Sequence, residues 1–117
     1  MSKIVRVRPV LLSAPYADAG NLEVQLHLPE GYRTCGLVEV TFEDGTTGLG
    51  EGYLAVFAPR VFVELVELIA PYLIGSDGTE IAARYADACL VCDYWSQQGA
   101  ARHAVSAIEI ALVEAWK

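Results

Sequence analysis

The sequence predicts an α+β fold: an antiparallel β-meander followed by a three-helix bundle packed on the sheet. Apolar residues alternate with polar ones over residues 1–53, as in strands with one face in water. They recur every three to four residues over 59–117, as in helices. Because strands and helices occupy separate halves, the helices should cover one face of the sheet. The length suits one core, so we treat 1–117 as a single domain.

Alternating runs and one turn define the expected sheet. Residues 5–8, 22–28 and 38–43 each alternate apolar with charged or polar side chains, and we expect Val5 and Val7 to share the buried face of the first run. Asp44-Gly45 follows the third run, and this dipeptide adopts the positive φ angles of a tight hairpin. The run that follows this turn should therefore pair with the third.

The first helix is expected over residues 59–73. Pro59 suits a first turn because its missing N–H would have no partner there. Pro71 lies near the expected end, and Gly75 follows as a terminator. Four residues at helical spacing should form the buried stripe: Val61, Leu65, Leu68 and Tyr72.

The second helix is expected to open with Asp77-x-x-Glu80, whose side chains could satisfy free backbone N–H groups. The third is expected over 100–117 and has an unusually wide apolar face. Such a face needs two neighbours, so we expect a missing part of the protein after Lys117 and self-association through the uncovered face. The expected core stripe of the second helix is Ile81, Tyr85, Ala88, Cys89 and Cys92.

Charge and apolar content exclude several classes of protein. The chain has 8 Lys and Arg against 15 Asp and Glu, a formal net charge of −7, which disfavours nucleic acid and anionic membrane surfaces as partners. No run is apolar enough for an export signal or a membrane span. Three cysteines make an odd count, so a secreted disulfide scaffold is disfavoured. We expect a cytoplasmic protein with reduced thiols.

Three segments, in order and spacing, resemble the N-terminal domain of the enolase superfamily, in its mandelate racemase and muconate lactonizing branch. Residues 38–51 carry the hairpin and a Gly-Leu-Gly-Glu strand, 70–75 read Ala-Pro-Tyr-Leu-Ile-Gly, and 107–112 read Ala-Ile-Glu-Ile-Ala-Leu. The resemblance implies a capping domain, which in such enzymes precedes a (β/α)8 barrel. That C-terminal barrel is absent from these residues.

The resemblance also implies the chemistry of the whole enzyme. The barrel binds Mg2+ and abstracts the proton alpha to a carboxylate, in a reaction of the racemase or acid-sugar dehydratase type. Accordingly we expect no catalytic, cofactor-binding or metal-binding residue in this chain, and no activity of the chain alone. The implied partners are a barrel domain, a small carboxylate substrate and further copies in a homo-oligomer.

Two loops of such a cap close over the barrel and contact the substrate, and they correspond here to residues 14–21 and 51–58. Within them, Tyr16, Tyr53 and Phe57 are the expected substrate-binding residues. Mandelate racemase has a phenol at the position of Phe57, and the missing hydroxyl makes mandelate itself a less favoured substrate.

Other functional hypotheses compete with this one. The chain could be a freestanding small-molecule-binding or oligomerisation module. Cys89-x-x-Cys92 could be a redox pair or half of a zinc site completed by Cys35 with His27 or His103. We favour a packing role for the pair, because it lies on an apolar stripe, and a solvated or structural role for both histidines.

The glycines of Gly48-x-Gly50-x-Gly52 could suggest a phosphate cradle. Their spacing is not that of a phosphate-binding loop, and we interpret them as sites where a neighbouring backbone approaches closely. For Glu51 we favour a hydrogen bond that fixes a loop or another domain over a catalytic role.

Overall fold

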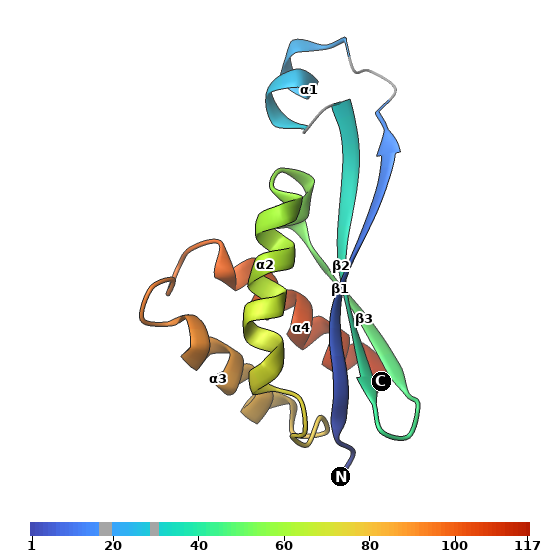
Figure 1. Cartoon of the computed structure of the whole chain (residues 1–117), viewed down its shortest axis with the longest axis vertical. Coiled ribbons are helices and arrows are strands. Elements are labelled where there is room, and N and C mark those ends of the chain that lie inside the picture. Colours follow the sequence, from blue (N-terminus) through green and yellow to red (C-terminus); the bar gives the residue numbers. More distant parts are fainter. Residues whose placement is uncertain (17–19, 29–30) are drawn as a thin grey trace.

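A computed structural model describes residues 1–16, 20–28 and 31–117. It contains one three-stranded antiparallel sheet in the order β1-β2-β3, with the main helices covering one side of it (Figure 1). The α+β class is confirmed, and the described residues include no barrel. The elements are β1 (Ile4–Pro15), α1 (Leu22–His27), β2 (Tyr32–Phe42), β3 (Thr47–Gly52), α2 (Pro59–Ile69), α3 (Ile81–Cys92), α4 (Ala101–Ala115) and the 3-10 turns η2 (Tyr53–Val56) and η3 (Ala70–Tyr72).

The sheet is much longer on one side than on the other. β1 pairs with β2 from Ile4↔Phe42 to Pro15↔Tyr32, whereas β3 reaches only as far as Gly36↔Gly52. Beyond that pair the two long strands continue as a ribbon, and α1 lies at its far end, apart from the other helices (Figure 1). The domain therefore measures 50 × 32 × 20 Å.

The predicted hairpin is confirmed. Gly45 has a φ of 89°, and its N–H donates to the Phe42 carbonyl at 2.9 Å. The Asp44 carboxylate accepts from the Thr46 N–H at 2.9 Å. These bonds close the turn that joins β2 to β3.

Two expectations for the strands are wrong. Of residues 22–28, all but the last form α1, because the Asn21 side chain accepts from the Glu23 N–H at 2.8 Å and starts a helix. No strand pairs with this segment in the described residues. Val5 is 49% exposed, whereas Ile4 and Val7 are buried, because the pairing with β2 shifts between Ile4 and Arg6. Such a bulge places an extra residue in one strand, so the side chains beyond it change faces of the sheet.

Glycines allow α4 to lie directly on β3. A Cβ atom at Gly48 would stand 2.0 Å from the Ala111 carbonyl oxygen, and one at Gly50 would stand 1.9 Å from that of Ala107. At Gly52 it would stand 2.2 Å from the Phe62 ring. Close approach of a neighbouring backbone is therefore confirmed at Gly48 and Gly50, whereas at Gly52 the close neighbour is a side chain.

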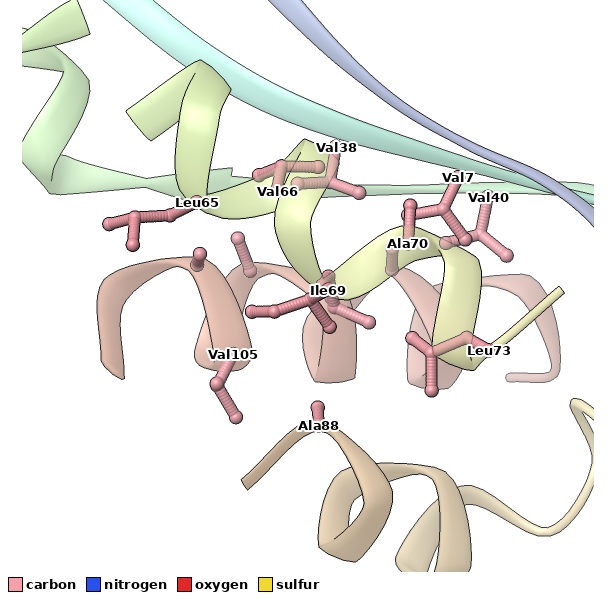
Figure 2. Packing of buried hydrophobic residues seen from close by; sticks show 14 of the residues in the cluster. Val7, Val38, Val40, Leu65, Val66, Ile69, Ala70, Leu73, Ala88 and Val105 are labelled. Atoms are coloured by element: carbon pink, nitrogen blue, oxygen red, sulfur yellow. The ribbon is translucent and has the colours of Figure 1, made fainter. Parts of the chain in front are cut away.

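The buried stripe of α2 is displaced from the predicted one. Leu65 is buried as expected, but Val61, Leu68 and Tyr72 are 46%, 47% and 65% exposed. Arg60, Glu64 and Glu67 form the polar side of this helix, and apolar residues cover the rest of it. Overlapping stripes at helical spacing were therefore available, and packing selected the one centred on Ile69. Figure 2 shows Ile69 between the sheet valines and the helices that carry Val105 and Ala88. The buried residues of α2 are Phe62, Leu65, Val66 and Ile69.

The expected cap of α3 is also wrong, although its core stripe is confirmed. α3 begins after Glu80 without a side-chain hydrogen bond at its cap. The Asp77 carboxylate instead accepts from Thr79, through its N–H at 3.0 Å and its hydroxyl at 2.7 Å, and from the Ser2 N–H at 3.2 Å. Asp77 thus ties the N-terminal segment to this loop. Of the predicted stripe, Ala88 and Cys92 are buried, and Ile81, Tyr85 and Cys89 pack against the core.

The wide apolar face of α4 is covered within this chain, which corrects the expectation that it would be exposed. β3 lies on one side of the helix, and α2 and α3 lie on the other (Figures 1 and 2). Ile110 and Val113, on the outer side, are about half exposed. An exposed α4 face is therefore no longer a reason to expect self-association. Across the described parts of the chain, every helix is too short or too polar to cross a bilayer.

Candidate functional site

The three predicted substrate contacts meet in one cleft, which we call the aromatic cleft. Its volume is about 210 Å³, and it lies at the far end of the ribbon. Tyr16 directly follows β1, whereas Tyr53 and Phe57 come from η2 and the residue after it. The lining residues are Tyr16, Glu23, Val24, His27, Leu28, Arg33, Tyr53, Val56 and Phe57.

The η2 turn fixes the two aromatic rings that follow β3. Ala55 and Val56 are 0% and 2% exposed, so they anchor the turn in the core. The N–H groups of Phe57 and Ala58 both donate to the Leu54 carbonyl, at 3.0 and 2.9 Å. With its middle residues buried, the turn leaves the side chains at its two ends facing the cleft.

The aromatic rings contact one another and remain accessible. The Tyr53 and Phe57 ring centroids are 5.3 Å apart at an angle of 78°. The His27 ring meets Phe57 edge-on at 6.3 Å. Tyr16, Tyr53 and Phe57 are 39%, 58% and 43% exposed. Large rings grouped on a surface in this way mark a place where a ligand or a partner binds.

Three polar cleft residues were missed by sequence reasoning. His27 was assigned to a solvated strand face, but α1 brings it against Phe57. Glu23 shares that helix, and Arg33 extends from β2. None of the ion pairs formed by the described residues includes Arg33. Glu23 and His27 reach the cleft only when 22–27 is helical, and Asn21, which caps that helix, is the sequence signal that points to it.

Glu51 makes a side-chain contact within the sheet, to the neighbouring strand, and does not line the aromatic cleft. The Cys35 thiol donates to the Glu51 carboxylate at 3.4 Å, between the paired strands β2 and β3. Burial, followed by this hydrogen bond, raises the pKa of the Cys35 thiol. A thiol that stays protonated is a poor nucleophile. We therefore assign this contact a structural role, in which it joins β2 to the end of β3.

Neither cysteine of Cys89-x-x-Cys92 belongs to a metal site in the described structure. Across residues 1–16, 20–28 and 31–117, no three His, Cys, Asp or Glu side chains gather closely enough to hold a metal ion. Cys92 is buried, and the Arg102 guanidinium donates to the Cys89 sulfur and to the Asp93 carboxylate, each at 2.7 Å. The Arg102 contact with Cys89 thus joins α3 to α4. The His, Cys, Asp and Glu side chains of the described residues do not form a site for the Mg2+ that the resemblance implies for the whole enzyme.

Comparisons with known proteins agree with this architecture. The sequence pattern of the mandelate racemase / muconate lactonizing enzyme N-terminal domain matches residues 30–116. No curated protein matches the chain.

Solved structures of enolase-type proteins share the fold. An enolase superfamily member from Agrobacterium tumefaciens has 25% identity and a TM-score of 0.77, covering 96% of this chain and 34% of its own. The 3,6-anhydro-D-galactonate cycloisomerase of Zobellia galactanivorans has 25% identity and a TM-score of 0.74, covering 95% and 27%. A muconate cycloisomerase from Azorhizobium caulinodans, at 21% identity, a TM-score of 0.70, and 97% and 27% coverage, shows the fold alone. The chain thus spans about a third or less of the length of these structures.

Proposed function

This chain belongs to the mandelate racemase / muconate lactonizing enzyme N-terminal domain family, and we propose that it caps the mouth of a (β/α)8 barrel and gates access of a small carboxylate substrate. The observation that carries the proposal is the aromatic cleft. Two loops that are distant in sequence bring Tyr16, Tyr53 and Phe57 to one exposed site. A lid of this kind excludes water from a reaction and selects the substrate.

The lining of the cleft suits an organic acid. Tyr53 and Phe57 offer apolar faces, and Arg33 supplies a cation that can hold a carboxylate through two parallel hydrogen bonds. The Zobellia relative acts on a sugar acid, 3,6-anhydro-D-galactonate. We propose the same substrate class here, an acid with polar groups along its chain.

The proposed reaction of the assembled enzyme is Mg2+-dependent abstraction of the proton alpha to the carboxylate, as in racemases and acid-sugar dehydratases. When bound to the barrel, Mg2+ would supply positive charge that stabilises the enolate. This chain's residues hold no metal and move no proton in the proposal. They orient the substrate and exclude water.

An active chimera tests the proposal. The chain is joined to the barrel of the Zobellia cycloisomerase in place of its own cap, and Mg2+-dependent turnover is measured with a panel of sugar acids. We expect no turnover from this chain alone, and turnover from the chimera above that of the uncapped barrel. A chimera that unfolds in one cooperative thermal transition, yet is no more active than the barrel, would contradict the capping role.

Variants of the cleft locate the effect. Tyr53→Ala and Phe57→Ala should lower kcat/KM of the chimera by about tenfold or more, because substrate positioning contributes strongly to rate. Tyr94→Ala is the matched control, since Tyr94 is 99% exposed and lies outside the cleft. Equal losses of kcat/KM in all three variants would show that the aromatic cleft does not position the substrate.

A further inference from the structure

A second cleft lies beside the ribbon, and it shares no residue with the aromatic cleft. Its volume is about 560 Å³, and we call it the hydroxyl cleft. The ribbon contributes Ser13, Tyr32 and Thr34, and the start of α2 contributes residues 58–61. Successive side chains of a strand face opposite sides of the sheet. Tyr32 and Thr34 therefore lie on one face of the ribbon, and Arg33, which lines the aromatic cleft, lies on the other.

The charge of the hydroxyl cleft is opposite to that of the chain as a whole. Arg60 is its one charged lining residue, and no carboxylate lines it, although the chain has a formal net charge of −7. None of the ion pairs found in the described residues includes Arg60. A guanidinium without a carboxylate partner, at the edge of a cleft, is suited to an anion from solution.

Two hydroxyl groups that line the same cleft as Arg60 leave one hydrogen-bond donor available. The Ser13 and Thr34 hydroxyl oxygens are 2.8 Å apart, and Thr34 is only 4% exposed. Each hydroxyl has one hydrogen, and their mutual bond uses only one of the two. The second hydrogen can therefore be donated to an acceptor in the cleft.

The backbone at the start of α2 adds donors to the same place. α2 begins at Pro59 without a side-chain hydrogen bond at Ala58. The N–H groups of Arg60 and Val61 belong to the first turn, where a helix offers them no internal partner. Together with the cation and the hydroxyls, they form a donor-rich lining that contains no charged acceptor.

We propose that the hydroxyl cleft binds a small oxyanion, a carboxylate or a phosphate group, with Arg60 as the main contact and the Ser13–Thr34 pair as a second. The proposal does not rest on the capping function, because it uses a different face of the ribbon and needs no barrel. Its ligand is a free organic acid or a phosphorylated metabolite, because each carries an oxyanion that the cleft can bind.

Titration of the ¹⁵N-labelled chain tests the proposal. Inorganic phosphate and acetate are added in separate arms at constant ionic strength, held with potassium chloride, and backbone amide shifts are followed by NMR. We expect saturable shifts at Thr34, Arg60 and Val61 in at least one arm, and the stronger arm identifies the source. Shifts that grow linearly in both arms would overturn the proposal.

Matched variants decide whether Arg60 and the hydroxyls bind the anion. Arg60→Gln should weaken binding about tenfold or more, and Thr34→Val about fivefold. Arg8→Gln should leave it unchanged, because Arg8 is paired with Glu39 outside the cleft. If Arg33→Gln abolishes the shifts and Arg60→Gln does not, the anion binds in the aromatic cleft and the proposal fails.

Discussion

The two ends of this domain use their side chains in opposite ways. At the end with three strands, Val38, Val40, Phe62 and Ala111 are all 0% exposed, and α4 lies against glycines of β3. At the far end, where only β1 and β2 continue, Tyr53 and Phe57 are 58% and 43% exposed. The comparison indicates that one end stabilises the fold and the other is available for binding.

The different burial of apolar side chains explains why the two ends can have separate roles. Complete burial of a large apolar side chain contributes about 1.5–3 kcal/mol to stability, so the exposed rings of the cleft contribute much less than those of the core. Substitutions at the core end should therefore change stability, whereas substitutions at the far end should change binding.

The largest expected difference is between two phenylalanines close in sequence. Phe62 is 0% exposed and Phe57 is 43% exposed. Phe62→Ala should lower the free energy of unfolding by about 3–5 kcal/mol, and Phe57→Ala by about 1 kcal/mol or less, since it loses mainly ring contacts. Urea unfolding followed by circular dichroism measures both. Similar losses in the two variants would show that the far end belongs to the core.

A smaller effect is expected where α4 lies on β3. Gly50→Ala should destabilise the fold by about 3 kcal/mol, because the added Cβ would stand 1.9 Å from the Ala107 carbonyl oxygen. Gly20→Ala is the control, since a Cβ there meets nothing within 4 Å. A Gly50→Ala variant as stable as this control in the same urea experiment would refute the close contact of helix and strand.

The smallest effect concerns acid. Hydrogen bonds from Thr79 and from the Ser2 N–H hold the pKa of Asp77 below its ordinary value of 3.8. This contribution to stability is complete above the pKa of the unfolded chain and is lost as the pH falls through the lower folded pKa. Asp77→Asn should therefore make stability less dependent on pH below about 4. Thermal melts between pH 2 and 6 measure this, and an unchanged acid dependence would exclude Asp77 as a contributor.

Sequence reasoning succeeded where a residue's environment is mostly local. The turn at Asp44-Gly45 follows from backbone preference, and Gly45 has a φ of 89°. Gly75 also has a positive φ, but α2 already ends at Ile69, and the Gly75 N–H donates to the Ile4 carbonyl, so Gly75 does not cap that helix. The stripe of α3 also held, although Leu90 lies outside it and is 74% exposed. For the candidate site, the resemblance placed Tyr16, Tyr53 and Phe57 in two loops, and the structure brought all three to one cleft.

Sequence reasoning failed where two patterns fitted the same residues. Residues 22–28 alternate like a strand, yet no strand pairs with them in the part of the chain that the structure describes, and the Asn21 cap favoured a helix. In α2, either of two stripes could have faced the core, and contact with both the sheet and α4 chose between them. His27 and Arg33 could not be assigned to the cleft, because their neighbours come from other elements.

By itself, the sequence determined the sheet-forming first half with its hairpin, the helical second half and the glycines that permit close packing, although not the helix α1, because these features depend on backbone preference and on the period of apolar residues. Only the tertiary structure decided which face of α2 is buried, that α4 is covered within this chain, and which polar groups meet in the two clefts. These outcomes depend on which surfaces pack together, and side-chain contacts between distant segments set that packing.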